Sequence, residues 1–182
     1  MPRTLGPWLI CLAWFATVCG GFWWFEYRHW QSFNPIGVTF NGQHLSVLYQ
    51  HLQQRMDGQN QITVVHFANQ KCACNRYSKQ HRKALQPILR RSQQHLVSPE
   101  MAKRMGVSVP ASPAVAIWDK TVKLAYFGPY SSGMVCGQGE DFVGRVFKRL
   151  ANNQNPEWIN MLGLGCYCPW QFTEKYEDKQ HA

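Results

Sequence analysis

The longest uninterrupted apolar segment of the chain lies near its N-terminus. Residues 5–25 contain no charged side chain, and about 20 such residues are enough to cross a bilayer as a helix. Aromatic side chains gather at the end of this segment, as is typical of a membrane interface. Neither a small-x-small cleavage site nor a lipobox follows the apolar centre. We therefore predict an uncleaved transmembrane anchor over residues 1–28.

The charges beside this segment favour a cytoplasmic N-terminus. The free amine and Arg3 lie on its short side, whereas Glu26 partly offsets Arg28 on the other side. The more basic flank of a membrane span usually stays in the cytoplasm. The sequence therefore predicts a single-pass inner-membrane protein whose soluble domain faces the periplasm, an oxidising compartment.

Beyond the anchor, the apolar pattern changes several times between helical and strand periods. Apolar residues at intervals of three and four predict helices over 45–56, 75–89 and 142–150. A further short helix is expected to begin at Ser98, with this side chain as its cap, and to end at Gly106. Runs rich in β-branched residues predict strands at 38–40, 62–68, 114–118 and 122–127.

Three of these strands have features that place them in a sheet. The segment 62–68 is apolar without strict alternation, which is typical of a central strand covered on both faces. Three residues separate 114–118 from 122–127, a spacing that suits an antiparallel hairpin. Between Arg91 and Pro99 the pattern supports little more than a short strand at Leu96-Val97.

The same pattern divides the chain into four parts. Residues 29–37 resemble a linker because Asn34-Pro35 interrupts any regular element. One domain is predicted over 38–151, and residues 152–182 form a C-terminal extension that contains cysteines. The length of 182 residues suits one modest domain with such additions.

Charge is distributed unevenly along this chain, whose formal net charge is +9. No acidic residue lies between Asp57 and Glu100. We interpret most of the basic residues there as a solvated helix face, because no helix-turn-helix, RRM or zinc-finger pattern points to nucleic acid as a partner. The basic residues in or beside this interval are Arg55, Lys71, Arg76, Lys79, Arg82, Lys83, Arg90 and Arg91.

The pair Cys72-Ala-Cys74 lies inside this basic interval, where the strand 62–68 gives way to a helix that begins at Asn75. Backbone N–H groups and the positive end of a helix dipole favour thiolate over thiol. Lys71 and Arg76 add positive charge beside the pair. Because the thiolate is the form that attacks disulfides, this placement predicts reactive cysteines.

Taken together, this strand, the cysteine pair that opens a helix, and a later proline before a strand-turn-strand-helix ending resemble the thioredoxin-like fold. The resemblance implies an α/β three-layer sandwich with a mixed central sheet. It also implies that Pro113 is cis and lies against the reactive thiol, and that Ser112 and Ala114 bind the substrate chain. The layout is similar to that of bacterial membrane-anchored thioredoxin-like proteins, including an uncharacterised family with a Cys-x-Cys site.

The chain departs from the thioredoxin-like pattern at two positions near the pair. Asn75 stands where the family has the second cysteine of Cys-x-x-Cys, and Cys74 arrives one residue early. His66 stands where the family often has an acidic residue before the phenylalanine of the central strand. This histidine either takes part in proton transfer or packs in the core, and we favour packing.

Our first interpretation is a thiol-disulfide oxidoreductase that needs no cofactor and acts on protein thiols or disulfides. Cys72 attacks the substrate disulfide and Cys74 resolves the mixed disulfide. A disulfide across a single intervening residue would be strained, so the pair is expected to favour oxidation or isomerisation.

Two other interpretations of the cysteines remain open. In one, Cys72 and Cys74 bind Cu(I) or a similar soft metal as a chaperone does, with His66 or a tail cysteine completing the site. In the other, the chain is a binding module in which Cys72-Ala-Cys74 is an inert disulfide and Cys136 pairs with Cys166 or Cys168. Cys166-Tyr-Cys168 is also a candidate second redox pair that exchanges with the first. Cys11 and Cys19 are expected to be apolar residues of the anchor.

Overall fold

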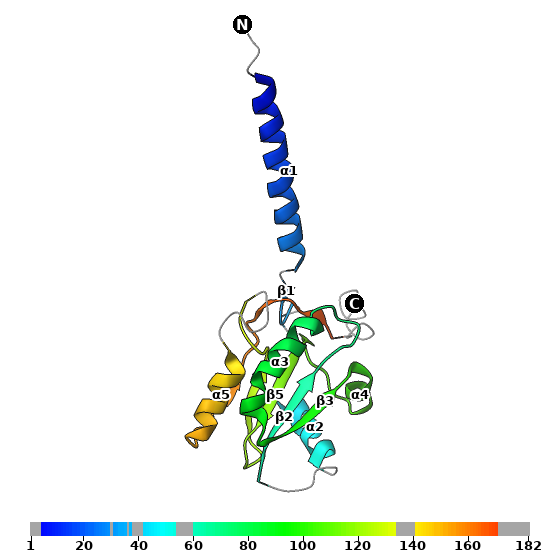
Figure 1. Cartoon of the computed structure of the whole chain (residues 1–182). Helices are drawn as coiled ribbons and strands as arrows, with labels where there is room; N and C mark the ends of the chain where they lie inside the picture. Colours follow the sequence, from blue (N-terminus) through cyan, green and yellow to red (C-terminus); the bar gives the residue numbers. More distant parts are fainter. Residues whose placement is uncertain are drawn as a thin grey trace. The chain divides into compact units, whose positions relative to one another are not determined.

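The computed structural model of the chain describes residues 5–29, 31–35, 37, 42–53, 60–133 and 141–170 (Figure 1). The chain forms two compact units, residues 1–30 and residues 31–182. The predicted strand 38–40 and Cys136 lie outside the described residues.

The described residues of the first unit form one helix, α1 (Leu5–His29). Its segment Gly6–Trp24 has a mean hydropathy of 1.4, and no part of it is buried inside the protein. At about 1.5 Å per residue, this segment spans most of the roughly 30 Å hydrocarbon core of a bilayer. The predicted helix is confirmed, and by length and composition it is able to cross a membrane.

A five-stranded mixed sheet forms the centre of the second unit, with strand order β3-β2-β5-β6-β7. The pairs β2·β3 and β6·β7 are parallel, whereas β2·β5 and β5·β6 are antiparallel. The predicted central strand and hairpin are therefore confirmed. The strands are β2 (Ile62–Phe67), β3 (Ser92–Val97), β5 (Ala114–Trp118), β6 (Leu124–Gly128) and β7 (Trp158–Ile159).

Within the described part of this unit, four helices pack on the sheet, and two of them begin at a side-chain cap. The Met101 N–H donates to the Ser98 hydroxyl oxygen, which confirms the predicted start of α4, and the Gly144 N–H donates to Asp141 at the start of α5. These contacts satisfy N–H groups that the first helical turn leaves free. The helices are α2 (Gln43–Gln53), α3 (Asn75–Leu89), α4 (Pro99–Arg104) and α5 (Phe142–Ala151).

Hydrophobic side chains cover both faces of the sheet. Successive strand residues point to opposite faces, so Val64 packs in one cluster and Val65 in the other. One cluster includes residues of α3 and α5, and the other includes residues of α2 and α4. Figure 1 shows α3 lying across the sheet. Cover on both faces explains why β2 lacks a polar alternation in the sequence.

Strand β3 is longer than its sequence suggests. It pairs with β2 in parallel along six residues, from Ile62 opposite Ser92 to Phe67 opposite Val97. Only Leu96-Val97 was apolar enough to be predicted. The strand lies at the edge of the sheet, where Gln94 and Leu96 are exposed. An edge strand tolerates polar residues because part of it faces water.

The folded unit also extends beyond the predicted domain, 38–151, at both ends. The predicted linker supplies β1 (Gln31–Ser32), which pairs antiparallel with β8 (Leu164–Gly165). Phe33 is fully buried, and its ring lies 6.1 Å from Phe127 and 5.3 Å from Tyr167. Phe33, which directly precedes Asn34-Pro35, therefore belongs to the core. At the other end, the predicted C-terminal extension supplies β7 to the central sheet.

A buried histidine, His66, lies within the core beneath α3. The His66 Nδ1 lies 2.6 Å from the Tyr130 hydroxyl oxygen, and its Nε2 lies 3.4 Å from Gln94 Oε1. Burial, together with the positive charge of Arg82, lowers the pKa of His66 to about 4. A neutral imidazole fits these contacts, because it accepts at one nitrogen and donates at the other. This geometry agrees with a packing role.

Replacing Phe33 with Ala should lower the free energy of unfolding by about 3–5 kcal/mol, because it empties a buried aromatic site. The measurement is denaturant unfolding of the full chain in mild detergent. Leu162 is 94% exposed, so Leu162→Ala is the matched control and should change stability by less than about 0.5 kcal/mol. Equal effects of the two substitutions would show that residues 31–35 do lie outside the core.

The low pKa of His66 predicts acid destabilisation. The unfolded chain binds a proton at this residue below about pH 6.5, whereas the folded protein does so only near pH 4. The contribution is therefore complete above pH 6.5 and is lost as the pH falls toward 4, by up to about 3 kcal/mol. Unfolding measured across this range should show the loss in wild type and in His51→Gln, an exposed control, but not in His66→Gln.

Candidate functional site

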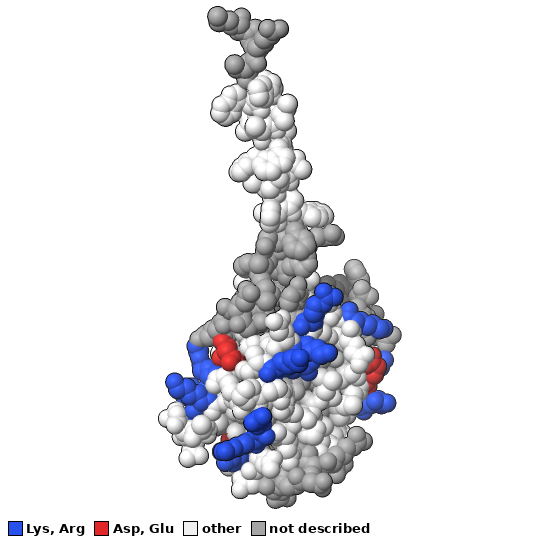
Figure 2. All heavy atoms as spheres, in the orientation of Figure 1, with Lys and Arg blue, Asp and Glu red and all other residues white. Residues whose placement is uncertain are grey.

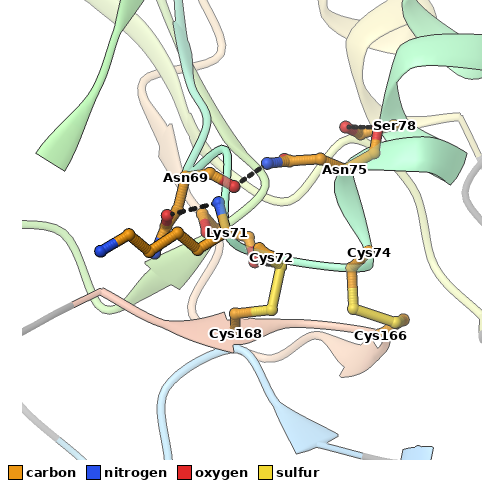
Figure 3. Close-up of a disulfide and its surroundings, with 9 residues drawn as sticks. Asn69, Lys71, Cys72, Cys74, Asn75, Ser78, Cys166 and Cys168 are labelled. Atoms are coloured by element: carbon orange, nitrogen blue, oxygen red, sulfur yellow. Dashed lines mark hydrogen bonds between the residues drawn. A yellow bond between two sulfur atoms is a disulfide. The ribbon is translucent and has the colours of Figure 1, made fainter.

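Cys72 and Cys74 lie in the turn that joins β2 to α3, as the sequence predicts. The Cys72 N–H donates to the Asn69 carbonyl oxygen (2.9 Å), and the Asn75 N–H donates to the Cys72 carbonyl oxygen (3.1 Å). The side-chain amide of Asn75, through Nδ2, also donates to the Asn69 carbonyl oxygen (Figure 3). Cys74 is the N-cap residue of α3. This turn therefore fixes both sulfur atoms at the start of a helix.

Each of these cysteines forms a disulfide with the predicted C-terminal extension, whose described residues, 152–170, are called the tail below. Cys72 is bonded to Cys168 and Cys74 to Cys166, with Cα–Cα distances of 5.8 Å and 5.6 Å. The structure thus corrects two pairings considered above: Cys72 is not bonded to Cys74, and neither tail cysteine is bonded to Cys136. The strain expected of a Cys72–Cys74 bond is therefore absent from this state.

The repeated Cys-x-Cys spacing explains this pairing. In an extended segment, residues two apart point to the same face, so Cys166 and Cys168 both face the turn (Figure 3). The first cysteine of each pair is bonded to the last of the other, as two segments running in opposite directions require. The candidate redox pair Cys166-Tyr-Cys168 is thus not bonded to itself, because each of its cysteines is bonded to one cysteine of the first pair.

The turn also meets the segment before β5. The Ser112–Pro113 peptide bond is cis, as predicted. The Cys72 Sγ lies 3.8 Å from the Ser112 carbonyl oxygen. Ser112 belongs to β4 (Ala111–Ser112), which pairs antiparallel with β9 (Cys168–Pro169) and places Ser112 opposite Cys168. The structure therefore brings Cys72, Ser112, Pro113 and Cys168 together, whereas Ala114 lies buried at the start of β5.

The tail covers this site. Cys72 and Cys74 are each 5% exposed, whereas Cys166 and Cys168 are half-buried. Ser112 is fully buried, and its hydroxyl oxygen has no hydrogen-bond partner among the described residues. Access of any large molecule to the Cys72 sulfur therefore requires part of the tail to move.

Positive charge surrounds the start of α3. Lys71 and Arg76 are exposed, and the first turn of the helix has no acidic residue. Figure 2 shows Lys and Arg side chains spread over this face of the folded unit, with few acidic ones. After reduction, this charge and the helix dipole favour the thiolate form of the nearby cysteines.

Three sulfur atoms lie close enough together to share a soft metal ion after reduction. The Sγ atoms of Cys72, Cys74 and Cys168 all lie within 4.8 Å of one another. This group of candidate ligands does not include His66, whose imidazole lies against Tyr130 instead. Of the two predicted ways to complete a metal site, only the tail cysteine has the required position.

Sequence reasoning missed two aromatic residues of the tail. Tyr167 is buried with its ring 5.3 Å from Phe33, and Trp170 is 3% exposed with its ring 5.9 Å from Phe67. The backbone N–H of Trp170 also donates to the Pro110 carbonyl oxygen at 3.4 Å. Large aromatic side chains directly beside paired cysteines were the available sign that the tail packs on the domain.

The solved structures that resemble this chain include two distant neighbours. An uncharacterised conserved protein from Geobacillus kaustophilus is 14% identical, with a TM-score of 0.42 over 64% of this chain and 80% of that protein. A protein of unknown function from Pseudomonas aeruginosa is 13% identical, with a TM-score of 0.37 over 66% of this chain and 90% of that protein.

A search of curated protein sequences found no match. A family model described as a domain of unknown function, DUF6436, matches residues 42–170. This match includes the turn with Cys72 and Cys74, the cis proline and both tail cysteines, and it covers well over half of the chain. The chain therefore belongs to the DUF6436 family.

Proposed function

We propose that the chain is a membrane-anchored thiol-disulfide oxidoreductase that acts on protein thiols or disulfides in the periplasm. Its reactive atom is the Cys72 sulfur. The observation that carries this proposal is the position of that sulfur, which lies 3.8 Å from the carbonyl oxygen of Ser112. Ser112 is the residue directly before the cis proline, Pro113. A substrate segment beside Ser112 would present its own sulfur to Cys72.

The proposal includes a thioredoxin-like fold, a three-layer sandwich. Support comes from the parallel β2-α3-β3 unit, the β5-β6 hairpin and the final helix α5, which follow the order expected of that fold. Hydrophobic clusters on both faces of the sheet also support three layers. In this fold, Cys72 and Pro113 would have the positions of the reactive thiol and the cis proline.

The chemistry is thiol-disulfide exchange and needs no cofactor. A substrate thiolate attacks Cys72 Sγ, the Cys72–Cys168 bond breaks, and Cys168 leaves as a thiolate that takes up a proton. A second substrate thiol then displaces Cys72, so that the substrate gains a disulfide and the protein gains two electrons. The reverse sequence reduces a substrate disulfide. Cys168, rather than Cys74, is the first resolving partner in this scheme.

Two features support a periplasmic location. Disulfides persist in oxidising compartments, and this protein has two that join segments 96 and 92 residues apart. The apolar helix α1 precedes the folded unit. With the amine and Arg3 in the cytoplasm, α1 would cross the inner membrane once and export the disulfide-bonded unit.

A second candidate function is delivery of a soft metal ion such as Cu(I). The observation that favours it is the group of Cys72, Cys74 and Cys168, whose sulfur atoms lie within 4.8 Å of one another. Thiolates are the ligands that Cu(I) prefers. The metal would require the reduced protein, because all three sulfurs are in disulfides here.

Equilibration of the full chain in detergent with reduced and oxidised dithiothreitol should reveal a reversible two-electron couple at Cys72–Cys168. Acid quenching, alkylation and peptide mapping report each disulfide separately. We expect Cys72→Ser to abolish both oxidation of reduced proteins and reduction of insulin-type disulfides, because it removes the sulfur that forms the mixed disulfide in both directions. Cys19→Ser, in α1, is the matched control and should behave as wild type. Equal activity of Cys72→Ser and wild type would refute the proposal.

Anaerobic titration of the reduced full chain with Cu(I), against a chelator, tests the second candidate. If the chain delivers metal, wild type and Cys19→Ser should bind one ion, whereas Cys72→Ser and Cys74→Ser should lose that binding. Retention of the ion without any disulfide exchange activity would favour the metal function over the oxidoreductase. The absence of both activities would leave a disulfide-stapled binding module.

A further inference from the structure

We infer that tail residues 167–170 occupy the site of a substrate, and that the site takes an extended protein segment with a cysteine followed two residues later by an aromatic side chain. The inference rests on the proposed function and names its substrate class. The tail residues that correspond to these two positions are Cys168 and Trp170.

The backbone of the tail lies as a bound segment would. β9 pairs antiparallel with β4, which has no other strand partner among the described residues. The Trp170 N–H extends this pairing with a hydrogen bond to the Pro110 carbonyl oxygen. Strand addition of this kind supplies affinity through main-chain contacts whatever the sequence of the bound segment. The edge of β4 is therefore a binding site that the tail now fills.

The cysteine position is fixed by this register. Cys168 lies opposite Ser112, and its sulfur is bonded to Cys72. A different segment in the same register would bring its cysteine to the same place. The buried Ser112 hydroxyl has no hydrogen-bond partner among the described residues, so it is free to contact a polar group of the incoming segment.

The aromatic position follows from Trp170. This side chain is 3% exposed and meets the Phe67 ring edge to face, with an angle of 84° between the ring planes and 5.9 Å between the centroids. An aromatic side chain gains more from burial than most residues and gains further from such a pair. Because the side chains at positions 168 and 170 of an extended segment share one face, a cysteine and an aromatic residue fit together.

Exchange with a substrate opens the site without removing the whole tail. When the substrate thiolate displaces Cys168 from Cys72, one S–S bond replaces another, and the proton lost by the substrate thiol balances the one gained by Cys168. Cys166 stays bonded to Cys74, and β8 stays paired with β1. Only residues 167–170 need to leave, and they remain tethered beside the site.

The test uses full-length Cys168→Ser/Trp170→Ala protein in detergent, in which Cys72 is free and the aromatic site is vacated. Two peptides, Gly-Ser-Tyr-Cys-Pro-Trp and Gly-Ser-Tyr-Cys-Pro-Ala, are offered as glutathione mixed disulfides. We expect the tryptophan peptide to form the mixed disulfide with Cys72 about tenfold more favourably. In the Cys168→Ser control, Trp170 still fills its site, and this preference should fall.

The outcomes separate the two proposals. Equal equilibrium constants for the two peptides would overturn the inference and leave the oxidoreductase proposal intact. Failure of both peptides to form a mixed disulfide with Cys72 would overturn both.

A second measurement avoids the double variant. Trp170→Ala alone should make Cys72–Cys168 about tenfold easier to reduce by glutathione, because the tail loses its anchor. Leu162→Ala, an exposed residue of the same tail, should change this equilibrium less than about twofold. Equal shifts in the two variants would contradict a role for the aromatic site.

Discussion

The two disulfides between the start of α3 and the tail determine the arrangement of the whole site. Each joins segments more than 90 residues apart, and closing one loop of about 100 residues restricts the unfolded chain by about 4–5 kcal/mol in the chain-entropy account. The second bond adds much less, because it closes a small additional ring once the first is formed. Either bond alone therefore supplies most of this restriction, so one of them, Cys72–Cys168, can exchange at a lower cost while Cys74–Cys166 stays closed.

The sheet and the tail hold different parts of this site in place. The buried strands β2 and β5 place the cysteine turn and the cis proline at the same end of the sheet, where Cys72 meets Ser112. The tail closes the site through Tyr167 and Trp170, which pack on Phe33 and Phe67. Because Phe33 precedes the sheet in the chain and Tyr167 follows it, the two ends of the folded unit support each other.

Much of this arrangement could be predicted from local patterns. The apolar run at 62–68, the hairpin spacing after Pro113 and the Ser98 cap each identified an element, because the nearest neighbours in sequence determine them. The polar edge strand β3 was largely missed, since its partner β2 rather than its own residues stabilises it. The disulfide pairing was also missed, because it depends on a tail whose direction only the folded chain reveals.

Pro169 has a consequence for how the protein meets other chains. The Trp170 N–H points toward β4, and N–H groups alternate in direction along an extended strand, so residue 169 faces the opposite, outer side. A proline has no N–H to offer there. The outer rim of the β4·β9 ribbon therefore lacks a donor that an additional strand would need, and stacking of one molecule on another through this rim is disfavoured. The segment can remain available for exchange without promoting aggregation.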